Sequence, residues 1–279
     1  MSAPRVSVIM PVFDAGLDLD RAVRSVEAQT FADHELVIVD DGSRDPTTLE
    51  RLEAAARAPG VTVHRTENRG PSAARNLAIE HARAPYILPL DADDWLASRF
   101  LERTVPLLDA EPAVGVVHTW VEKVGEHHGT WRTGPFAIPA LLAQCTLHVT
   151  SLFRREIWSR AGGYDPQFVD SSEDWDLWLG AAEQGWEGRC VPEALAYYHR
   201  GPRSRERRAR APGIPRRRME LLVAKHRPLY ERHMEAALGS MYEELMQAGA
   251  SLERIYHHPA VRLALAVRGL LRGRGGDRA

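Results

Sequence analysis

The chain has 279 residues, of which 44% are hydrophobic and 27% are charged, a composition that indicates a globular protein with a sizeable buried core. The formal net charge of -2 excludes a strong overall basic field, so nucleic acid is not expected as a partner. The two cysteines, Cys145 and Cys190, are too few and too far apart for a disulfide framework or a thiolate metal site, which favours a reducing compartment.

The first 112 residues alternate between predicted strands and predicted helices. Apolar residues at helical spacing predict helices that contain Leu19, Leu49 and the segment Ser72–Arg83. Short apolar runs rich in β-branched residues predict buried strands at Val6–Val12, Leu36–Val39, Val61–His64 and Tyr86–Leu90. This order is typical of βαβ units. The expected fold class is therefore α/β, with a mainly parallel, Rossmann-like sheet flanked by helices.

The acidic sequence Asp91-Ala92-Asp93-Asp94 follows the fourth predicted strand. Carboxylates this close repel one another and are tolerated where a cation or solvent neutralises them. Their oxygens suit hard divalent ions such as Mg²⁺ or Mn²⁺, which usually accompany phosphates. Pro11–Asp14 and Asp40-Asp41 also fall at strand ends, where ligands bind in parallel sheets. The pattern indicates a metal-diphosphate site, and the alternative is a solvated acidic turn.

Two more segments have both a structural and a functional interpretation. Asp40-Asp41, followed by Gly42-Ser43, is a sequence that favours a turn capped by an aspartate side chain. A carboxylate at this position could also accept a hydrogen bond from an N–H group of a nucleotide base or from a ribose hydroxyl. In Asn68–Asn76, a Gly-Pro turn opens a helix whose start favours an anion. Arg75 in that helix would meet phosphate or a base; the alternative is an ion pair with Asp93 or Asp94.

The second half of the chain has a different pattern. A short helix is predicted near 156–160 and a longer one over 172–184. Strands are predicted at Val114–Val117, Trp120–Val124, Val191–Glu193 and Leu195–Tyr198. In the segment 173–178, acids alternate with large aromatics; Glu173 and Asp176 are ordinary partners of a helix dipole, and a carboxylate in such partly dry surroundings also suits a general base. His199, at a strand end, is either a structural residue or a metal ligand.

Beyond residue 200 the motifs end. Residues 200–218 are rich in arginine and proline and predict a mobile loop, with one or two arginines touching a diphosphate. Helices are predicted after it. The last, Pro259–Leu271, combines apolar residues with arginines, so it would pack on the domain or a second subunit; the alternative is contact with an anionic membrane.

Taken together, the motifs resemble those of the family-2 glycosyltransferases of GT-A fold. The resemblance runs from Val6 to about His199, which is about two thirds of the chain. It depends on the order and spacing of Val6–Phe13, Val39–Ser43, Asn68–Asn76, Asp91–Asp94 and Gly163-Tyr164-Asp165 before Glu173-Asp174.

The resemblance implies a role for several residues. It places Pro11, Val12 and Phe13 against the nucleoside of a nucleotide-sugar donor, with Asp41 and Asp40 reading the base. It puts Arg75 near the uracil or diphosphate. Asp93 would bind the divalent ion, Mn²⁺ or Mg²⁺, and Asp91 would contact ribose or metal-bound water; Ala92, between them, would also belong to the donor site. Asp174 would be the catalytic base, and His199 falls where some members have a further metal contact.

The implied reaction is inverting transfer of a sugar from a UDP- or dTDP-linked donor to an acceptor hydroxyl. The acceptor would be a saccharide, a lipid-linked glycan or a small hydroxyl compound. The Gln-X-X-Arg-Trp pattern of processive synthases is missing after Asp174. The alternatives are a catalytically silent nucleotide-sugar binding protein and a sugar nucleotidyltransferase; the latter needs a basic Gly-rich loop, which Phe13–Gly16 does not offer.

The expected organisation follows from the same boundaries. Residues 1–112 would form the nucleotide-sugar-binding half, 113–200 the mixed acceptor-binding half of the same domain, and 201–279 an Arg-rich loop and a helical extension. The chain starts without a signal-peptide pattern and has no apolar run of the roughly twenty residues that a membrane span needs. We therefore expect a cytoplasmic protein, with peripheral contact at the inner membrane face and a homodimer as further alternatives.

Overall fold

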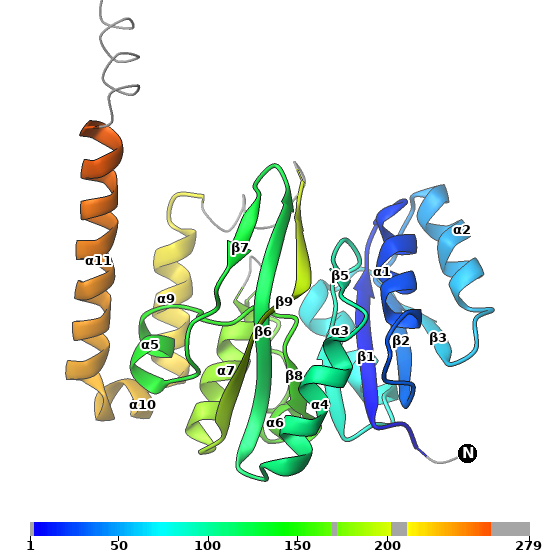
Figure 1. The fold of residues 1–279 in the computed structure, drawn as a ribbon, viewed down its shortest axis with the longest axis horizontal. Helices are drawn as coiled ribbons and strands as arrows, with labels where there is room; N and C mark the ends of the chain where they lie inside the picture. Colours follow the sequence, from blue (N-terminus) through cyan, green and yellow to red (C-terminus); the bar gives the residue numbers. More distant parts are fainter. Residues whose placement is uncertain (1–2, 169–171, 202–210, 258–279) are drawn as a thin grey trace, which may run out of the picture. The chain divides into compact units, whose positions relative to one another are not determined.

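The alternation predicted for the first 112 residues is confirmed in the computed structural model, which describes residues 3–168, 172–201 and 211–257. Its first elements are β1 (Val6–Val12), α1 (Asp18–Glu27), β2 (His34–Asp40), α2 (Pro46–Ala55), β3 (Val61–Arg65), α3 (Pro71–His81) and β4 (Tyr86–Pro89) (Figure 1). Local sequence explains two of the helix starts. Prolines occupy the first turns of α2 and α3, and the Asp45 carboxylate caps α2 by accepting the N–H of Thr48 at 2.8 Å.

The next part of the chain adds shorter and more irregular elements. They are β5 (Trp95–Leu96), α4 (Phe100–Ala110), β6 (Val114–Gly125), β7 (Gly129–Trp131), α5 (Ile138–Ala143), β8 (Leu152–Arg154), α6 (Arg155–Ala161), α7 (Glu173–Glu183) and β9 (Glu187–Arg200). The prediction of two strands in each of the regions of β6 and β9 is wrong, because each is one strand. The pairing between β6 and β9 shifts in register around Trp120, which marks a β-bulge. Pro192 lies at this bulge, where a proline is tolerated without ending the strand.

Among the described residues, nine strands form one sheet in the order β3-β2-β1-β4-β8-β6-β9-β5, with β7 paired to β6. The first four are mutually parallel, whereas β8 is antiparallel to both β4 and β6. The expected α/β class, with a parallel half and a mixed half, is confirmed. Because β1, β2 and β4 are parallel neighbours, the segments that follow them emerge at the same edge of the sheet.

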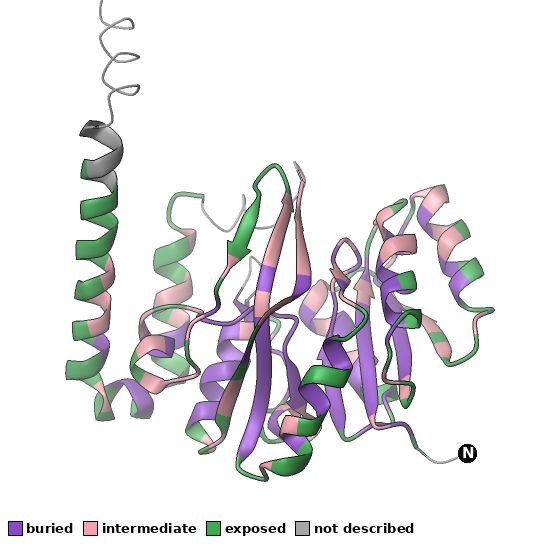
Figure 2. Ribbon diagram, in the orientation of Figure 1, coloured by how far each residue is buried: buried purple, intermediate pink, exposed green. Residues whose placement is uncertain are grey.

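The core lies along this sheet (Figure 2). Every residue of β1 except Pro11 is buried, so both faces of this central strand are covered. On one face Val8 and Met10 pack in a cluster with Leu19 of α1 and Phe100 of α4, and all four are fully buried. α3 packs on β1 and β2 as well. A rigid central strand therefore fixes the loops at its carboxyl end.

The chain divides into two compact units, residues 1–232 and 233–279. The first includes α9 (Ile214–Lys225) and α10 (Arg227–Arg232), and the second begins with α11 (Met234–His257). The predicted loop over 200–218 is wrong at its end, because α9 already starts at Ile214, where Pro215 suits a first helical turn. Residues 202–210 and the predicted helix Pro259–Leu271 lie outside the described residues. In the described part of the chain, no helix is both long and apolar enough to cross a bilayer.

Candidate active site

The loops after β1 and β2 are fastened to each other. The Asp14 carboxylate accepts the backbone N–H groups of Arg44 and Asp45 at 2.7 and 2.8 Å. Asp40 accepts the N–H of Ser43 at 2.8 Å, which confirms the turn interpretation of that residue. Asp41 is buried and its two oxygens accept the N–H groups of Arg69 and Gly70 at 2.8 and 2.9 Å. Burial raises the pKa of Asp41, and these two bonds oppose the rise.

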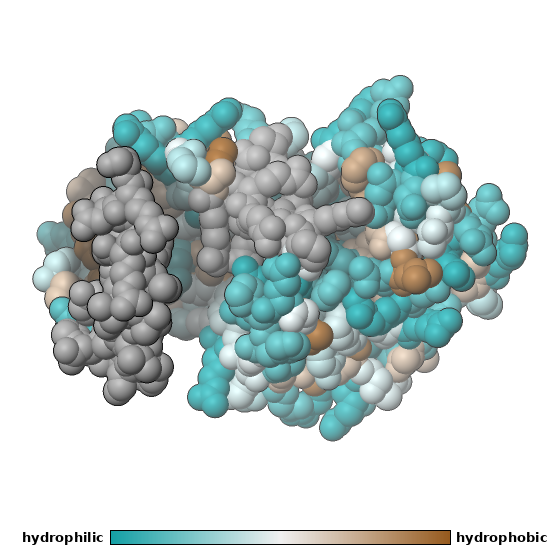
Figure 3. All heavy atoms as spheres, turned by 90° about the horizontal axis from the view of Figure 1, so that it is seen from above, coloured by the Kyte–Doolittle hydropathy of each residue, from teal (hydrophilic) through white to brown (hydrophobic). Residues whose placement is uncertain are grey.

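The residues predicted against a nucleoside differ in exposure. Phe13 is 52% exposed at the end of β1, and Pro11 is partly exposed. The side chains of Val12 and Ala92 are buried, so any contact with a ligand would come from their backbone. The view from above looks onto this edge of the sheet, where the described surface is mostly hydrophilic with isolated apolar spots (Figure 3). Phe13 therefore offers an exposed aromatic ring just after β1.

The acidic residues after β4 are crowded and poorly solvated. Asp94 is 1% exposed, its Oδ1 accepts the backbone N–H of His199 at 2.8 Å, and burial raises its pKa well above the ordinary range. Burial, then repulsion from Asp91, raises the pKa of Asp93 to about 6. Crowded, poorly solvated carboxylates of this kind fit a hard divalent cation. Within the described ranges, however, no three His, Cys, Asp or Glu side chains already form a closed metal cage.

Arg75 is the central cation of the site. Its guanidinium is 0% exposed, and it donates to Asp91 Oδ1 and Glu173 Oε1, both at 2.5 Å. Burial alone would lower the pKa of Arg75, but the two carboxylates raise it by more than burial lowers it, so Arg75 stays charged. The predicted alternative, an ion pair of Arg75 with Asp93 or Asp94, is wrong, because the partners of Arg75 are Asp91 and Glu173. Arg75 thus joins the acidic loop after β4 to the start of α7.

A second contact ties α3 to the segment before α7. Asn76 Oδ1 accepts the N–H of Tyr164 at 2.7 Å and the indole N–H of Trp158 at 2.8 Å, and its Nδ2 donates to the Tyr164 carbonyl. Gly163 has a φ of +94°, and a Cβ there would lie 3.0 Å from Asn76 Oδ1. Glycine is therefore required at 163, and Arg75 and Asn76 together hold two distant motifs side by side.

Asp174 lies in the first turn of α7, directly after Glu173, which pairs with Arg75. Its Oδ1 accepts the N–H of Trp175 at 2.8 Å, and Cys145 Sγ lies 4.0 Å from its Oδ2. Burial, then the charge of Asp174, raises the pKa of Cys145, so the thiol stays protonated; its closer acceptor is the carbonyl of Leu147, at 3.3 Å. Asp91 and Asp174, two of the predicted site residues, are thus connected through Arg75 and Glu173. Glu173 is more than the dipole partner that the sequence suggests.

Two histidines lie beside the acidic loop. His199 Nδ1 is 3.8 Å from Asp18 Oδ2, and its role as a metal ligand stays a prediction. His148, which sequence reasoning missed, is buried with Nε2 4.0 Å from Asp94 Oδ2. Burial lowers its pKa to about 4, so it is neutral at pH 7. Its ring lies 5.0 Å from that of Tyr198 and 6.0 Å from that of Trp131. No local pattern around His148 would have singled it out.

A cluster of charges on the other side of α7 involves the end of α9. His226 is 3% exposed, and its Nε2 and Nδ1 lie 2.9 Å from Asp176 Oδ1 and 3.0 Å from Glu183 Oε2. Lys225 Nζ donates to Asp176 Oδ2 at 2.7 Å and to Asp165 Oδ2 at 2.8 Å. Burial alone lowers the pKa of His226, but the two carboxylates raise it more, so its pKa is raised.

The raised pKa of His226 predicts how stability depends on pH. The folded state favours the imidazolium, so this contribution is complete below the ordinary histidine pKa of about 6.5 and is lost as pH rises through the raised value. We expect the unfolding temperature of the wild type to fall more steeply than that of His226→Gln between about pH 6.5 and 9. Thermal unfolding of both proteins across this range measures the difference; parallel curves would contradict it.

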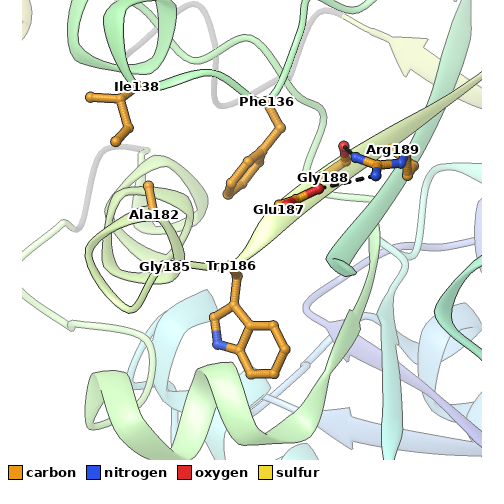
Figure 4. Close-up of a pocket in the computed structure, with 8 residues that line it drawn as sticks. All are labelled: Phe136, Ile138, Ala182, Gly185, Trp186, Glu187, Gly188 and Arg189. Atoms are coloured by element: carbon orange, nitrogen blue, oxygen red, sulfur yellow. Dashed lines mark hydrogen bonds and ion pairs between the residues drawn. The ribbon is translucent and has the colours of Figure 1, made fainter. Parts of the chain in front are cut away.

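A cavity of about 300 Å³ lies elsewhere in the first unit. It is lined by Phe136 and Ile138, by the end of α7, and by Trp186 to Arg189 at the start of β9 (Figure 4). Asp174 and His199 lie at the opposite ends of α7 and β9. None of the predicted site residues lines this cavity, so it is separate from the candidate active site.

The sequence is similar to known glycosyltransferases. Residues 7–165 match the family described as glycosyl transferase family 2. A putative glycosyltransferase of Bacillus subtilis, EpsE, is 29% identical over 201 residues, which cover 70% of this chain and 72% of that protein. Other relatives are longer: the chain spans 30% of an uncharacterized glycosyltransferase of Rickettsia felis, which is 29% identical over 197 residues and 64% of this chain.

The fold is similar to solved structures. S. aureus TarS in complex with UDP-GlcNAc has a TM-score of 0.59 at 20% identity, and the match covers 72% of this chain and 60% of that one. The mannosyltransferase PcManGT from Pyrobaculum calidifontis, in complex with GDP-Man and Mn²⁺, has a TM-score of 0.56 at 22% identity, covering 97% and 81%. The expected GT-A type of fold is confirmed.

Proposed function

The chain belongs to glycosyltransferase family 2, and we propose that it moves a sugar from a nucleoside-diphosphate donor to an acceptor hydroxyl with inversion at the anomeric carbon. The observation that carries this proposal is the ion-pair bridge from Asp91 through Arg75 to Glu173. It holds an acidic loop suited to a metal-diphosphate group beside Asp174, a carboxylate suited to proton transfer. Membership of the family speaks against a nucleotidyltransferase, and turnover of a nucleotide sugar is what separates an enzyme from a silent binding protein of the same fold.

The donor would bind across the ends of β1 and β2. Phe13 offers an exposed ring for stacking on a base, and Asp41, with Asp40, supplies carboxylates at the same edge. The complexes of TarS with UDP-GlcNAc and of PcManGT with GDP-Man support a nucleotide sugar as the class of donor. We propose a UDP- or dTDP-sugar, as the family resemblance implies.

Asp93 and Asp91, with His199, are the side chains that would hold Mn²⁺ or Mg²⁺. Their fit follows from the raised pKa of Asp93 and its repulsion by Asp91, since a cation relieves both desolvation and repulsion. A bound divalent ion supplies Lewis acidity that neutralises charge on the leaving diphosphate. The Mn²⁺ in the PcManGT complex supports the presence of a divalent ion.

Asp174 would take the proton of the acceptor hydroxyl as that oxygen attacks the anomeric carbon. A single displacement needs one base on the face opposite the leaving group, and it inverts the configuration. The N–H of Trp175 orients the carboxylate by a hydrogen bond of 2.8 Å, and the thiol of Cys145 lies beside it. Arg75, paired with two carboxylates, fixes the separation between the acidic loop after β4 and the start of α7.

A thermal-shift screen tests the proposed function. The probes are UDP-GlcNAc, UDP-glucose, dTDP-glucose and GDP-mannose, each with Mn²⁺ and with EDTA. We expect one nucleotide class to raise the unfolding temperature, and to do so more with Mn²⁺, because a ligand that binds the folded state stabilises it. No shift with any of them would contradict the proposal.

Asp93→Ala tests the metal assignment. Removal of this carboxylate should lower Mn²⁺-dependent UDP affinity by about tenfold or more, whereas affinity in EDTA should change little. Isothermal titration with UDP, with and without Mn²⁺, measures both. Asp33→Asn, which alters an exposed aspartate, is the control. If Asp93→Ala keeps the full gain in affinity from Mn²⁺, the metal is held elsewhere.

The acceptor and the location of the protein remain broader proposals. We propose an acceptor that is a saccharide, a lipid-linked glycan or a small hydroxyl compound, used on the cytoplasmic side. Contact of residues 259–271 with a membrane or with a second copy of the chain stays a prediction, because these residues lie outside the described ranges.

A further inference from the structure

Lys225 links two aspartates that flank the segment carrying Asp174. Its Nζ lies 2.8 Å from Asp165 Oδ2 and 2.7 Å from Asp176 Oδ2. Asp165 precedes this segment and Asp176 lies in the first turn of α7, so the ammonium group closes a loop of the chain between them. The Asp176 side chain is 3% exposed, which strengthens the contact relative to one in water.

His226 occupies the other oxygen of Asp176. Its Nε2 faces Asp176 Oδ1 at 2.9 Å and its Nδ1 faces Glu183 Oε2 at 3.0 Å. Only the imidazolium carries a hydrogen on both ring nitrogens, so carboxylates on both sides of the ring favour that form. Both oxygens of Asp176 are thus held by cations from the turn between α9 and α10, and Glu183 extends this hold to the last turn of α7.

The surrounding contacts anchor the same turn. Tyr230 of α10 donates its hydroxyl hydrogen to the carbonyl of Leu142 at 3.0 Å, and Trp175 donates its indole N–H to the carbonyl of Leu141 at 2.6 Å. Leu222 and Leu229, on either side of the turn, are buried. Lys225 and His226 are therefore presented to α7 from a packed element of the first unit, not from a free tail.

We propose that Lys225 and His226 are positioning residues for glycosyl transfer, which hold Asp176 so that the first turn of α7 presents Asp174 to the acceptor. This inference rests on the proposed function of Asp174 as the base. The family match ends at residue 165, so nothing in it assigns a role to either residue. A base must lie within hydrogen-bond reach of the proton it removes, and a displacement of about 1 Å can cost about a hundredfold in rate.

The experiment compares Lys225→Met, Lys225→Arg and the wild type by steady-state kinetics, with the nucleotide sugar that gives the largest shift in the screen above and with release of its nucleoside diphosphate as the readout. We expect Lys225→Met to lower kcat by about tenfold or more while donor affinity stays within about twofold of the wild type. Lys225→Arg, which keeps the positive charge, should regain most of the lost kcat. Arg227→Gln, which removes the exposed pair with Glu231 on the neighbouring helix α10 and lies outside the arginine-rich segment, is the matched control and should leave kcat unchanged.

Different results would overturn different claims. A kcat of Lys225→Met within twofold of the wild type overturns the positioning role, as does a fall in unfolding temperature with an unchanged kcat. If Lys225→Met does not fold, Asp165→Ala removes one of its two acceptors while leaving the Asp176–His226 pair, and the same kcat criterion applies. If Asp174→Asn keeps normal turnover, or no nucleotide sugar binds the wild type, the proposed function itself fails.

Discussion

Asp174→Asn is expected to lower kcat by about a thousandfold while donor affinity changes by no more than about twofold. General base catalysis typically contributes about 10²–10⁴ in rate, and asparagine cannot accept the acceptor's proton. Its carbonyl oxygen can still accept the N–H of Trp175, so the start of α7 should keep its conformation. The donor would bind at the ends of β1, β2 and β4, where no contact is changed.

Kinetics at saturating donor, together with UDP affinity from titration, separate the two effects. A loss of kcat at constant donor affinity is the signature of an interaction made only in the transition state. Asp33→Asn, at an exposed position, makes the same chemical change away from the site and should have no effect. A kcat within tenfold of the wild type would remove Asp174 as the base, even if the donor site is correct.

Local sequence patterns were sufficient to predict the parallel half of the sheet and the residues at its carboxyl edge. β1, predicted at Val6–Val12, has the same bounds in the structure, because an apolar, β-branched run between turns is a local signal. The aspartates at the ends of β2 and β4 follow from the same strands. Their proximity could be inferred since parallel neighbours end at one edge.

The contacts that assemble the site could not be predicted in the same way. Arg75 and Glu173 are 98 positions apart in the sequence, and nothing in either neighbourhood identifies the other. Glu173 at a helix start has a sufficient local explanation as a dipole partner, which conceals its pairing. Similarly, β6 and β9 are predicted as broken strands because a bulge depends on the partner strand. Lys225 and His226 lie in a region without motifs, and only the packing of α9 brings them to α7.

Arg75→Met is expected to destabilise the folded protein by about 3–5 kcal/mol, the usual cost when one partner of a buried ion pair is removed. Glu173 is 3% exposed and would lose its buried ion pair with Arg75, and the Asp91 side chain, 23% exposed, would lose its ion pair with Arg75 as well. Methionine keeps much of the volume and flexibility of the arginine stem, so the loss would be mainly electrostatic. Chemical denaturation at pH 7 measures the change.

The double variant Arg75→Met/Glu173→Gln distinguishes charge from packing. If the cost comes from losing the attraction between Arg75 and the buried Glu173 carboxylate, neutralising Glu173 should make the double variant more stable than Arg75→Met alone, an interaction that a double-mutant cycle measures directly. Arg103→Met is the matched control: its pair with Glu193 has the same 2.5 Å separation but is exposed, and such pairs contribute little. A double variant no more stable than Arg75→Met would mean that Arg75 contributes through packing. In that case the bridge would not be what holds the acidic loop against α7, and the observation that carries the proposed function would lose its physical basis.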